Sequence, residues 1–203
     1  QAMRRMAERG ATVVLGVGFA QADAISKVAA EFPDTKFSII DVSWLDAPNL
    51  RQYAFKEHEG SYIVGVAAAK ASKTGKVGFV GGMDIGLIRR FACGYVGGVK
   101  SINASAEVYQ NMTGTTPAAW NDPAKGAELT QSQIDRGADV VYHAAGGTGA
   151  GVIQAAADAG KLAIGVDSNQ NGMAPGSVLT SMLKRVDVAA YETFMDVKNG
   201  NFS

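Results

Sequence analysis

The chain has 203 residues and a mass of 21.1 kDa, which suits one large domain or two small ones. Hydrophobic residues make up 47% of it and charged residues 19%, so it can form a core and is not intrinsically disordered. Lys plus Arg and Asp plus Glu each number 19, and this zero net charge gives no electrostatic reason to expect nucleic acid or an anionic membrane as a partner.

Cysteine and histidine are scarce. Cys93 is the single cysteine, which excludes an internal disulfide and a cysteine-rich metal site. The two histidines, His58 and His143, are too few for a multi-histidine zinc site. No apolar run approaches the roughly 18 residues needed to span a membrane. We therefore expect no metal and no cofactor, and we expect Cys93, in the middle of a predicted helix, to be buried.

Short β-rich runs alternate with helical stretches along the chain. Strands are predicted at residues 11–17, 36–41, 76–80, 106–110, 139–144, 162–167 and 178–183. Helices are predicted at residues 20–31, 61–72, 85–100, 123–136, 151–159 and 187–199. The last helix is expected to bury Val186, Ala190, Phe194 and Val197. This alternation is typical of an α/β fold with parallel sheets. We find no internal repeat in the sequence.

A polar segment at residues 72–76 separates an alanine-rich helix from a fresh run of strand, helix and strand. We therefore predict a partial α/β lobe at residues 1–73 and a fuller α/β lobe at residues 76–185. The final helix can pack on either lobe, so residues 186–203 have the option of returning to the first.

Polar residues and glycines gather where the predicted strands end. They are Gly18-Phe19, Asp41, Gly81-Gly82-Met83-Asp84, Gly146-Gly147-Thr148-Gly149 and Asp167-Ser168-Asn169-Gln170. Ligands of open α/β sheets bind outside the carboxyl ends of the strands. The pattern therefore predicts a small-molecule site at these ends.

Each of these residues also has a purely structural interpretation. The glycine-rich segment 146–151 could bring backbone N–H groups to a ligand or form a tight strand-to-helix turn, and it matches neither a Walker A loop nor the G-x-G-x-x-G spacing. Asp167 could accept bonds from sugar hydroxyls or cap a turn, and the same choice applies to Asp41 and Asp84. Lys184 could point into the site or into solvent. Phe19 could stack on a flat ring or join the core, and His143 could flank a ligand or be a buried, satisfied histidine.

Catalytic groups are not evident. The sequence has no G-x-S-x-G nucleophile elbow, no His-x-x-x-His pair and no Cys-x-x-Cys pair. We expect a binding site without reactive side chains, and therefore a protein that is not an enzyme.

Four segments in the same order resemble the basic membrane protein family, the PnrA-like substrate-binding lipoproteins of ABC transporters. They read GVGFAQADAISKVAAEFPDTKFSIID from residue 16, KVGFVGGMDIGLIRRFACGYVGGVK from residue 76, DVVYHAAGGTGAGVIQAA from residue 139 and AIGVDSNQNGMAPGSVLTSMLKRVD from residue 163. Together they cover almost the whole chain. The resemblance implies the type I periplasmic-binding-protein fold, with two Rossmann-like lobes and parallel sheets, of which the first lobe is incomplete in this chain.

The resemblance also implies a function and a set of site residues. It implies a receptor that binds a purine or similar nucleoside in a cleft between the lobes and delivers it to an ABC permease outside the cytoplasm. Onto this chain it carries the ligand-binding residues Asp167, Lys184, Gly146, Gly147, His143, Phe19, Asp41 and Asp84.

Three departures from the family pattern stand out. An aromatic and polar segment that opens the family's first lobe lies outside this chain, as does the cysteine that would carry a lipid anchor, and residue 86 is Gly where the family usually has Pro. Three other functions remain open: a receptor for a sugar or another small polar solute, a nucleotide-dependent enzyme, and a ligand-sensing transcription regulator, which would need a helix-turn-helix arm and a basic face.

Overall fold

The computed structural model describes residues 1–203 and divides into two compact units. The first unit comprises Gln1–Phe55 with Arg185–Ser203, and the second comprises Lys56–Lys184. The boundary therefore lies at Phe55 and Lys56, and not at residues 73–76, where the polar segment suggested it. The C-terminal residues belong to the first unit.

The boundary lies before helix α3 (Glu57–Ala71), and not after it as predicted, because α3 packs backbone to backbone along α4 (Gly86–Ile102). A Cβ on Gly65 would lie 2.3 Å from the Tyr95 carbonyl oxygen, and one on Gly98 would lie 2.0 Å from that of Tyr62. Only glycine allows so close an approach. These contacts make α3 part of the second unit.

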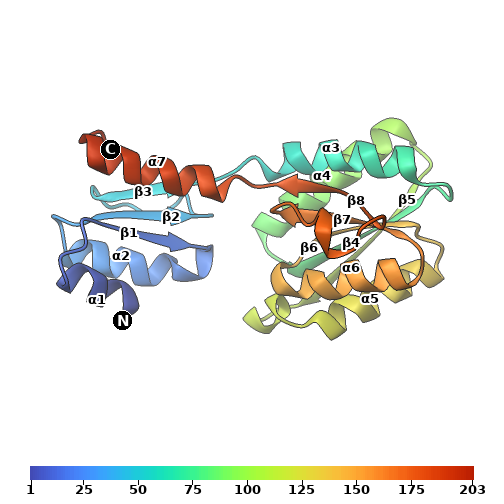
Figure 1. Ribbon diagram of the computed structural model, residues 1–203, viewed down its shortest axis with the longest axis horizontal. Coiled ribbons are helices and arrows are strands. Elements are labelled where there is room, and N and C mark those ends of the chain that lie inside the picture. Colours follow the sequence, from blue (N-terminus) through green and yellow to red (C-terminus); the bar gives the residue numbers. More distant parts are fainter. The chain divides into compact units, whose positions relative to one another are not determined.

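The first unit is built on a three-stranded parallel sheet in the order β1 (Val13–Val17), β2 (Lys36–Ile40), β3 (Leu50–Tyr53). Helices α1 (Ala2–Glu8) and α2 (Ala22–Glu31) cover one face and α7 (Val186–Asn199) covers the other (Figure 1). Ile25, Phe37 and Ile39 have no exposed surface and form the centre of its core. Strand β3 was not predicted from the sequence, because it is short and half of its residues are polar.

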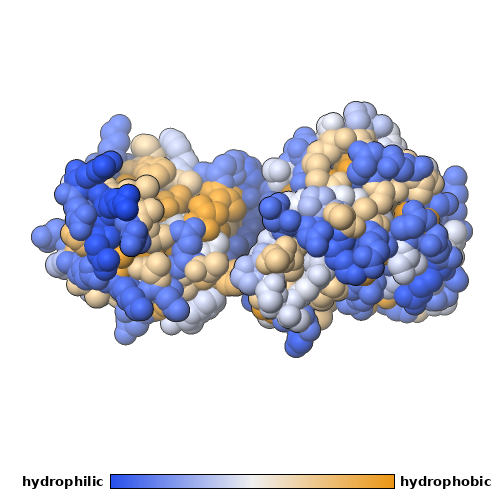
Figure 2. Space-filling model, turned by 90° about the horizontal axis from the view of Figure 1, so that it is seen from below, coloured by the Kyte–Doolittle hydropathy of each residue, from blue (hydrophilic) through white to orange (hydrophobic).

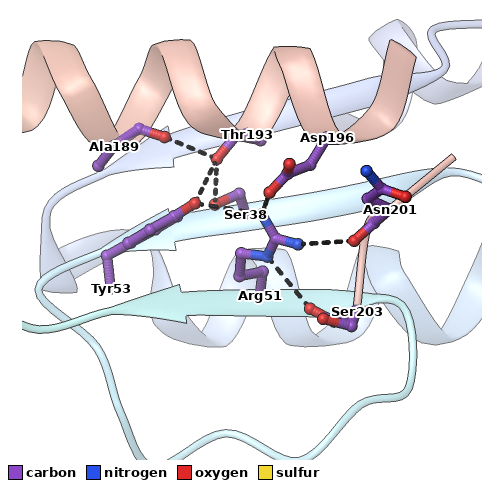
Figure 3. Close-up of polar contacts among 8 residues, drawn as sticks. All are labelled: Ser38, Arg51, Tyr53, Ala189, Thr193, Asp196, Asn201 and Ser203. Atoms are coloured by element: carbon purple, nitrogen blue, oxygen red, sulfur yellow. Dashed lines mark hydrogen bonds and ion pairs between the residues drawn. The ribbon is translucent and has the colours of Figure 1, made fainter. Parts of the chain in front are cut away.

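Helix α7 meets this sheet through a different face from the one predicted. Phe194 is 48% exposed, whereas Ala189 and Thr193 are buried. The Thr193 hydroxyl donates to the Ala189 carbonyl at 2.9 Å and lies 3.1 Å from the Tyr53 hydroxyl and 3.3 Å from that of Ser38 (Figure 3). The sheet face under α7 is polar, so the helix turns small and hydroxyl-bearing residues toward it.

The second unit is built on a five-stranded parallel sheet in the order β5 (Glu107–Gly114), β4 (Lys76–Met83), β6 (Val140–Ala144), β7 (Leu162–Asp167), β8 (Val178–Leu183). Helices α3 and α4 cover one face, and α5 (Pro123–Asp135) and α6 (Gly149–Asp158) cover the other (Figure 1). With both faces covered, its inner strands consist mostly of apolar residues. Phe79, Tyr95 and Tyr142 stack at the centre, with ring centroids 5.2–6.3 Å apart.

The two units share a repeated substructure that the sequence did not reveal. Strands β1 and β2 with α2, and strands β6 and β7 with α6, are each followed by a further parallel strand that is reached without an α-helix. In each copy a backbone bond of 2.8 Å joins the added strand to the end of the preceding one, in opposite directions: Asp41 N donates to Tyr53 O, and Lys184 N donates to Asp167 O. Asp41 and Asp167 correspond by their place at the end of the second strand of each copy and by their positive φ.

Cys93 is exposed, contrary to the sequence expectation. The buried residues of α4 include Ile88, Phe91, Tyr95 and Val99, which face the sheet and α3. Cys93 is two positions from Phe91, and two positions on a helix turn a side chain well away from the face that Phe91 occupies. The small residues on either side of Cys93 in the sequence therefore did not indicate that its side chain is buried.

Candidate functional site

The second unit has a topological switch point between β4 and β6. The chain passes from β4 to β5 on one side and then returns to β6 on the other. A ligand of such a sheet binds in the crevice outside the carboxyl ends of these strands. Here β4 ends in Gly82-Met83, and β6 is followed by the glycine-rich segment that begins at Gly146.

Trp120 lies at this switch point. A Cβ on Gly82 would be 2.1 Å from the indole Cζ3, and a Cβ on Gly146 would be 3.7 Å from the indole Cε3. The indole therefore packs on both strand ends, and it is partly buried against the core. Sequence reasoning missed Trp120, although it directly precedes the helix start at Asn121-Asp122-Pro123 that was recognised.

The glycine segment after β6 has mostly a packing role. A Cβ on Gly149 would lie 2.0 Å from His143 Cε1, and one on Gly151 would lie 1.8 Å from the Pro123 carbonyl oxygen. Gly146 has a φ of +57°, a conformation that favours glycine. The structure therefore supports the tight-turn interpretation for Gly149 and Gly151, while Gly146 and Gly147 lie next to the main chain of Trp120.

Asp167 ends β7 in a strained backbone conformation. Its φ is 66°, in the left-handed region that few residues other than glycine adopt, and its equivalent in the first unit, Asp41, has a φ of 69°. Strained residues persist where the surrounding structure holds them, often at ligand sites. Asp167 is exposed, and its carbonyl accepts the bond from Lys184 N. Asp167 is thus exposed at the carboxyl end of the sheet.

His143 does not reach the surface. It has no exposed area, which fits the interpretation of a buried histidine that supports the loop after Asp167. Its Nε2 lies 2.9 Å from Gln170 Oε1, and the same oxygen accepts from Val166 N at 2.8 Å. Burial lowers the pKa of His143 to about 4, so the ring is neutral at pH 7.

Lys184, immediately after β8, is buried rather than solvated. Its side chain is 5% exposed, and its Nζ lies 3.4 Å from Glu57 Oε1. Glu57 opens α3, and its other oxygen accepts from Arg90 Nε at 3.0 Å. Sequence reasoning missed Glu57, because the run Lys56-Glu57-His58-Glu59 reads as a solvated surface.

Tyr142 adds a hydroxyl near the same end of the sheet. It lies 3.2 Å from Ser61 Oγ. Burial raises the pKa of Tyr142, and the charges of Asp167 and Glu57 raise it further. The phenol therefore stays protonated and can donate a hydrogen bond.

Asp84 has a structural partner. Arg89 Nε and Nη2 donate to its two carboxylate oxygens at 2.7 and 2.9 Å, and these bonds hold the pKa of Asp84 below its usual range. The residue is exposed at the end of β4, one turn from Arg89. This pairing gives Asp84 a structural role as the partner of Arg89, and no side chain caps the start of α4.

Phe19 and Asp41 follow the ends of two adjacent strands of the first unit, β1 and β2, which pair in register from Val13 to Val17. Phe19 is partly buried and packs against the hydrophobic core of this unit. It therefore contributes to the core, which is one of the two roles that the sequence allowed. The visible face of this unit carries an apolar area bordered by hydrophilic side chains (Figure 2). Val17, at the end of β1, is 54% exposed.

Two grooves of the second unit are lined in part by residues of α3. One, of about 410 Å³, lies between α3 and β8 and is lined by Ile63, Leu179 and Leu183 among others. The other, of about 540 Å³, lies over α3 and α4 and includes Tyr62 and Cys93. Both are mainly apolar and lack the clustered donors and acceptors that a polar solute requires.

No cluster of three or more His, Cys, Asp or Glu side chains is placed to hold a metal ion. None of the helices combines the length and the apolar character needed to cross a bilayer.

Comparison with known proteins identifies the family. The ABC transporter substrate-binding protein PnrA-like family matches residues 1–203. The chain is 36% identical over 206 residues to a CD4+ T-cell-stimulating antigen of Listeria innocua, covering 94% of this chain and 57% of that protein. It is 35% identical over 212 residues to the ABC transporter nucleoside-binding protein BmpA of Lactococcus lactis, covering 96% of this chain and 59% of that protein.

A solved structure shows the same fold. An ABC transporter solute-binding protein of Aeropyrum pernix superposes with a TM-score of 0.88 at 32% identity, covering 99% of this chain and 58% of that one. The chain therefore spans somewhat more than half the length of these relatives, and its fold is that of type I periplasmic binding proteins. From the family match over its whole length and from this shared fold, the chain belongs to the PnrA-like substrate-binding proteins of ABC transporters.

Proposed function

We propose that this chain is the ligand-binding part of a solute receptor that captures a nucleoside for an ABC importer. One observation carries the choice of ligand. An indole, a carboxylate and an ammonium group, those of Trp120, Asp167 and Lys184, stand at the carboxyl ends of one sheet. The strand ends of β4, β6, β7 and β8 span roughly 14 Å at ~4.8 Å per strand.

Each group suits one part of a nucleoside. The indole of Trp120 provides a flat surface on which a purine or pyrimidine can stack. The ionised Asp167 accepts from two vicinal ribose hydroxyls, and Lys184 donates to ribose oxygens. Burying these groups without partners would be costly, so a ligand that lacks the hydroxyls is rejected. A phosphate beside Asp167 would be repelled, which favours nucleosides over nucleotides.

The remaining candidate residues have lesser roles in this proposal. Gly146 and Gly147 shape the surface beside Trp120, and His143 supports the loop that follows Asp167. Phe19 and Asp41 provide an aromatic ring and a carboxylate at the strand ends of the first unit. Asp84 is the weakest candidate, because Arg89 already engages both of its oxygens.

The proposal implies a transport role outside the cytoplasm. The small-molecule ligand is handed to a membrane permease that recognises the ligand-bound conformation, and contacts made only in that conformation shift the population toward it. A lipid anchor in the full-length protein would keep the receptor at the membrane. No catalytic step is needed, and the nucleoside leaves unchanged.

A receptor for a sugar or another small polar solute is the second candidate, because Asp167 and Lys184 would serve any vicinal diol. Thermal-shift measurements across nucleosides, free bases and pentoses distinguish the two. A one-site ligand at 100 times its Kd should stabilise the fold by about 2.7 kcal/mol. Stabilisation by pentoses alone would favour the sugar receptor. Chemical turnover of the nucleoside would contradict both.

A further inference from the structure

Glu57 is a carboxylate in an unusual place. Its side chain has no exposed surface, although its neighbour Glu59 in the same helical turn is 57% exposed. A buried carboxylate is strongly unfavourable unless it is paired. Glu57 meets two cations: Oε2 accepts from Arg90 Nε at 3.0 Å, and Oε1 lies 3.4 Å from Lys184 Nζ. The burial of Glu57 is therefore explained by its pairing with Arg90 and Lys184.

The ion pair joins the two ends of the second unit. Glu57 is one residue after the first chain boundary at Phe55 and Lys56, and Lys184 is the last residue before the second boundary. The pair thus links the first turn of α3 to the end of β8. Lys184 N is bonded in turn to the carbonyl of Asp167. One buried carboxylate thereby pairs with the side chain of a residue whose backbone is bonded to the strained aspartate.

Glu57 is the charged group of α3 that faces Lys184. The Phe91 ring of α4 has its centroid 5.8 Å from Nζ and limits where the stem can lie. Arg90, on the same helix, is half exposed and points at Glu57. A lysine has a long, flexible stem, so ordering it before the ligand arrives removes an entropy cost from binding.

We propose that Glu57 is the positioning residue of the ligand site. It holds the Lys184 ammonium at the carboxyl end of the sheet, where Asp167 also lies. The nucleoside part of this inference rests on the proposed function, whereas the hold on Lys184 rests on the ion-pair geometry alone. Arg90 pairs with the second oxygen of Glu57, so each oxygen of the buried carboxylate faces a cation.

The hold on Lys184 can be tested without a ligand. Native protein is treated with an amine-acylating ester, and modification of Lys184 is compared by mass spectrometry with that of Lys70, which is exposed on α3. Glu57→Gln should speed acylation of Lys184 roughly tenfold relative to Lys70, because the ammonium loses the ion pair that holds it in a buried place. Glu59→Gln is the matched control and should change nothing.

The ligand arm uses calorimetry with adenosine, guanosine and their free bases. Glu57→Gln should weaken nucleoside binding roughly tenfold and leave the free base unaffected, and it should have little further effect in a Lys184→Met background. If Glu57→Gln does not fold, Glu57→Asp, which keeps the charge on a shorter stem, should give intermediate acylation.

The outcomes separate the two proposals. Absence of nucleoside binding in the parent chain would end the proposed function, while the acylation measurement would still decide whether Glu57 holds Lys184. Equal acylation in Glu57→Gln and Glu59→Gln, or equal losses from Glu57→Gln with and without Lys184, would overturn the inference.

Discussion

Asp41 and Asp167 occupy the same left-handed backbone conformation, with φ values of 69° and 66°, at the ends of equivalent strands in the two units. No other residue except glycine has a positive φ in this chain. Aspartate enters this region more readily than most residues but still at a cost. The same strained feature thus occurs in both units, each time next to a strand that is reached without a helix. This repetition indicates that the loop after each strand determines how the carboxylate is exposed.

Asp167→Asn should weaken nucleoside binding about ten- to a hundredfold while the free base loses much less, because a charge-assisted pair contributes roughly 1.5–3 kcal/mol. Asparagine tolerates the left-handed backbone, so this variant removes the charge without the backbone penalty that alanine would add. Calorimetry on nucleoside and base measures both losses. Equal losses for the two ligands would favour a turn-capping role for Asp167 instead.

Gly98→Ala should destabilise the fold by roughly 2–3 kcal/mol, because the new Cβ would lie 2.0 Å from the Tyr62 carbonyl oxygen, where two backbones touch. Gly97→Ala, one residue earlier, is the matched control. Its Cβ would meet only the Tyr62 ring at 3.5 Å, and alanine should stabilise the helix by up to about 1 kcal/mol. Urea unfolding of the two variants should therefore give opposite signs, and matching signs would contradict the close helix contact.

His143 should make the fold less stable in acid. Its folded pKa of about 4 lies below the unfolded value, so the unfolded chain binds the proton first. The stability is complete above about pH 6.5, falls as the pH drops from there toward 4, and loses roughly 3 kcal/mol in all. Denaturant titrations between pH 4 and 7 measure this slope. It should flatten in His143→Gln and persist in His58→Gln; an unchanged slope in His143→Gln would rule out this origin.

Arg51 should anchor the C-terminal residues. It pairs with Asp196 at 2.6 Å and donates to the carbonyls of Ser203 at 3.1 Å and Asn201 at 3.4 Å (Figure 3). Arg51→Leu should cost about 1–2 kcal/mol and speed amide exchange in residues 196–203. Arg185→Leu breaks a pair whose partners are 60% and 69% exposed, so its stability should change little. Equal effects would mean that burial of Arg51 adds nothing.

Much of the fold follows from local pattern. Apolar runs such as Leu162–Asp167 cannot face water on either side, and Asp122-Pro123 starts a helix by known backbone chemistry, so these elements were predicted close to their observed bounds. The strand-end position of Asp167 followed in the same way, since strand polarity alone determines which end of a parallel sheet collects polar groups. The family resemblance rested on these same segments.

Other features depended on contacts between residues far apart in sequence. Helix α3 belongs to the second unit because its glycines meet those of α4, and α7 buries Thr193 because the sheet beneath it presents Ser38 and Tyr53. Glu57 was hidden in a charged run, and its burial depends on Arg90 and Lys184, 33 and 127 residues away. Composition and periodicity report which face of an element is apolar, but they do not report which partner will cover it, and only the tertiary structure decides that.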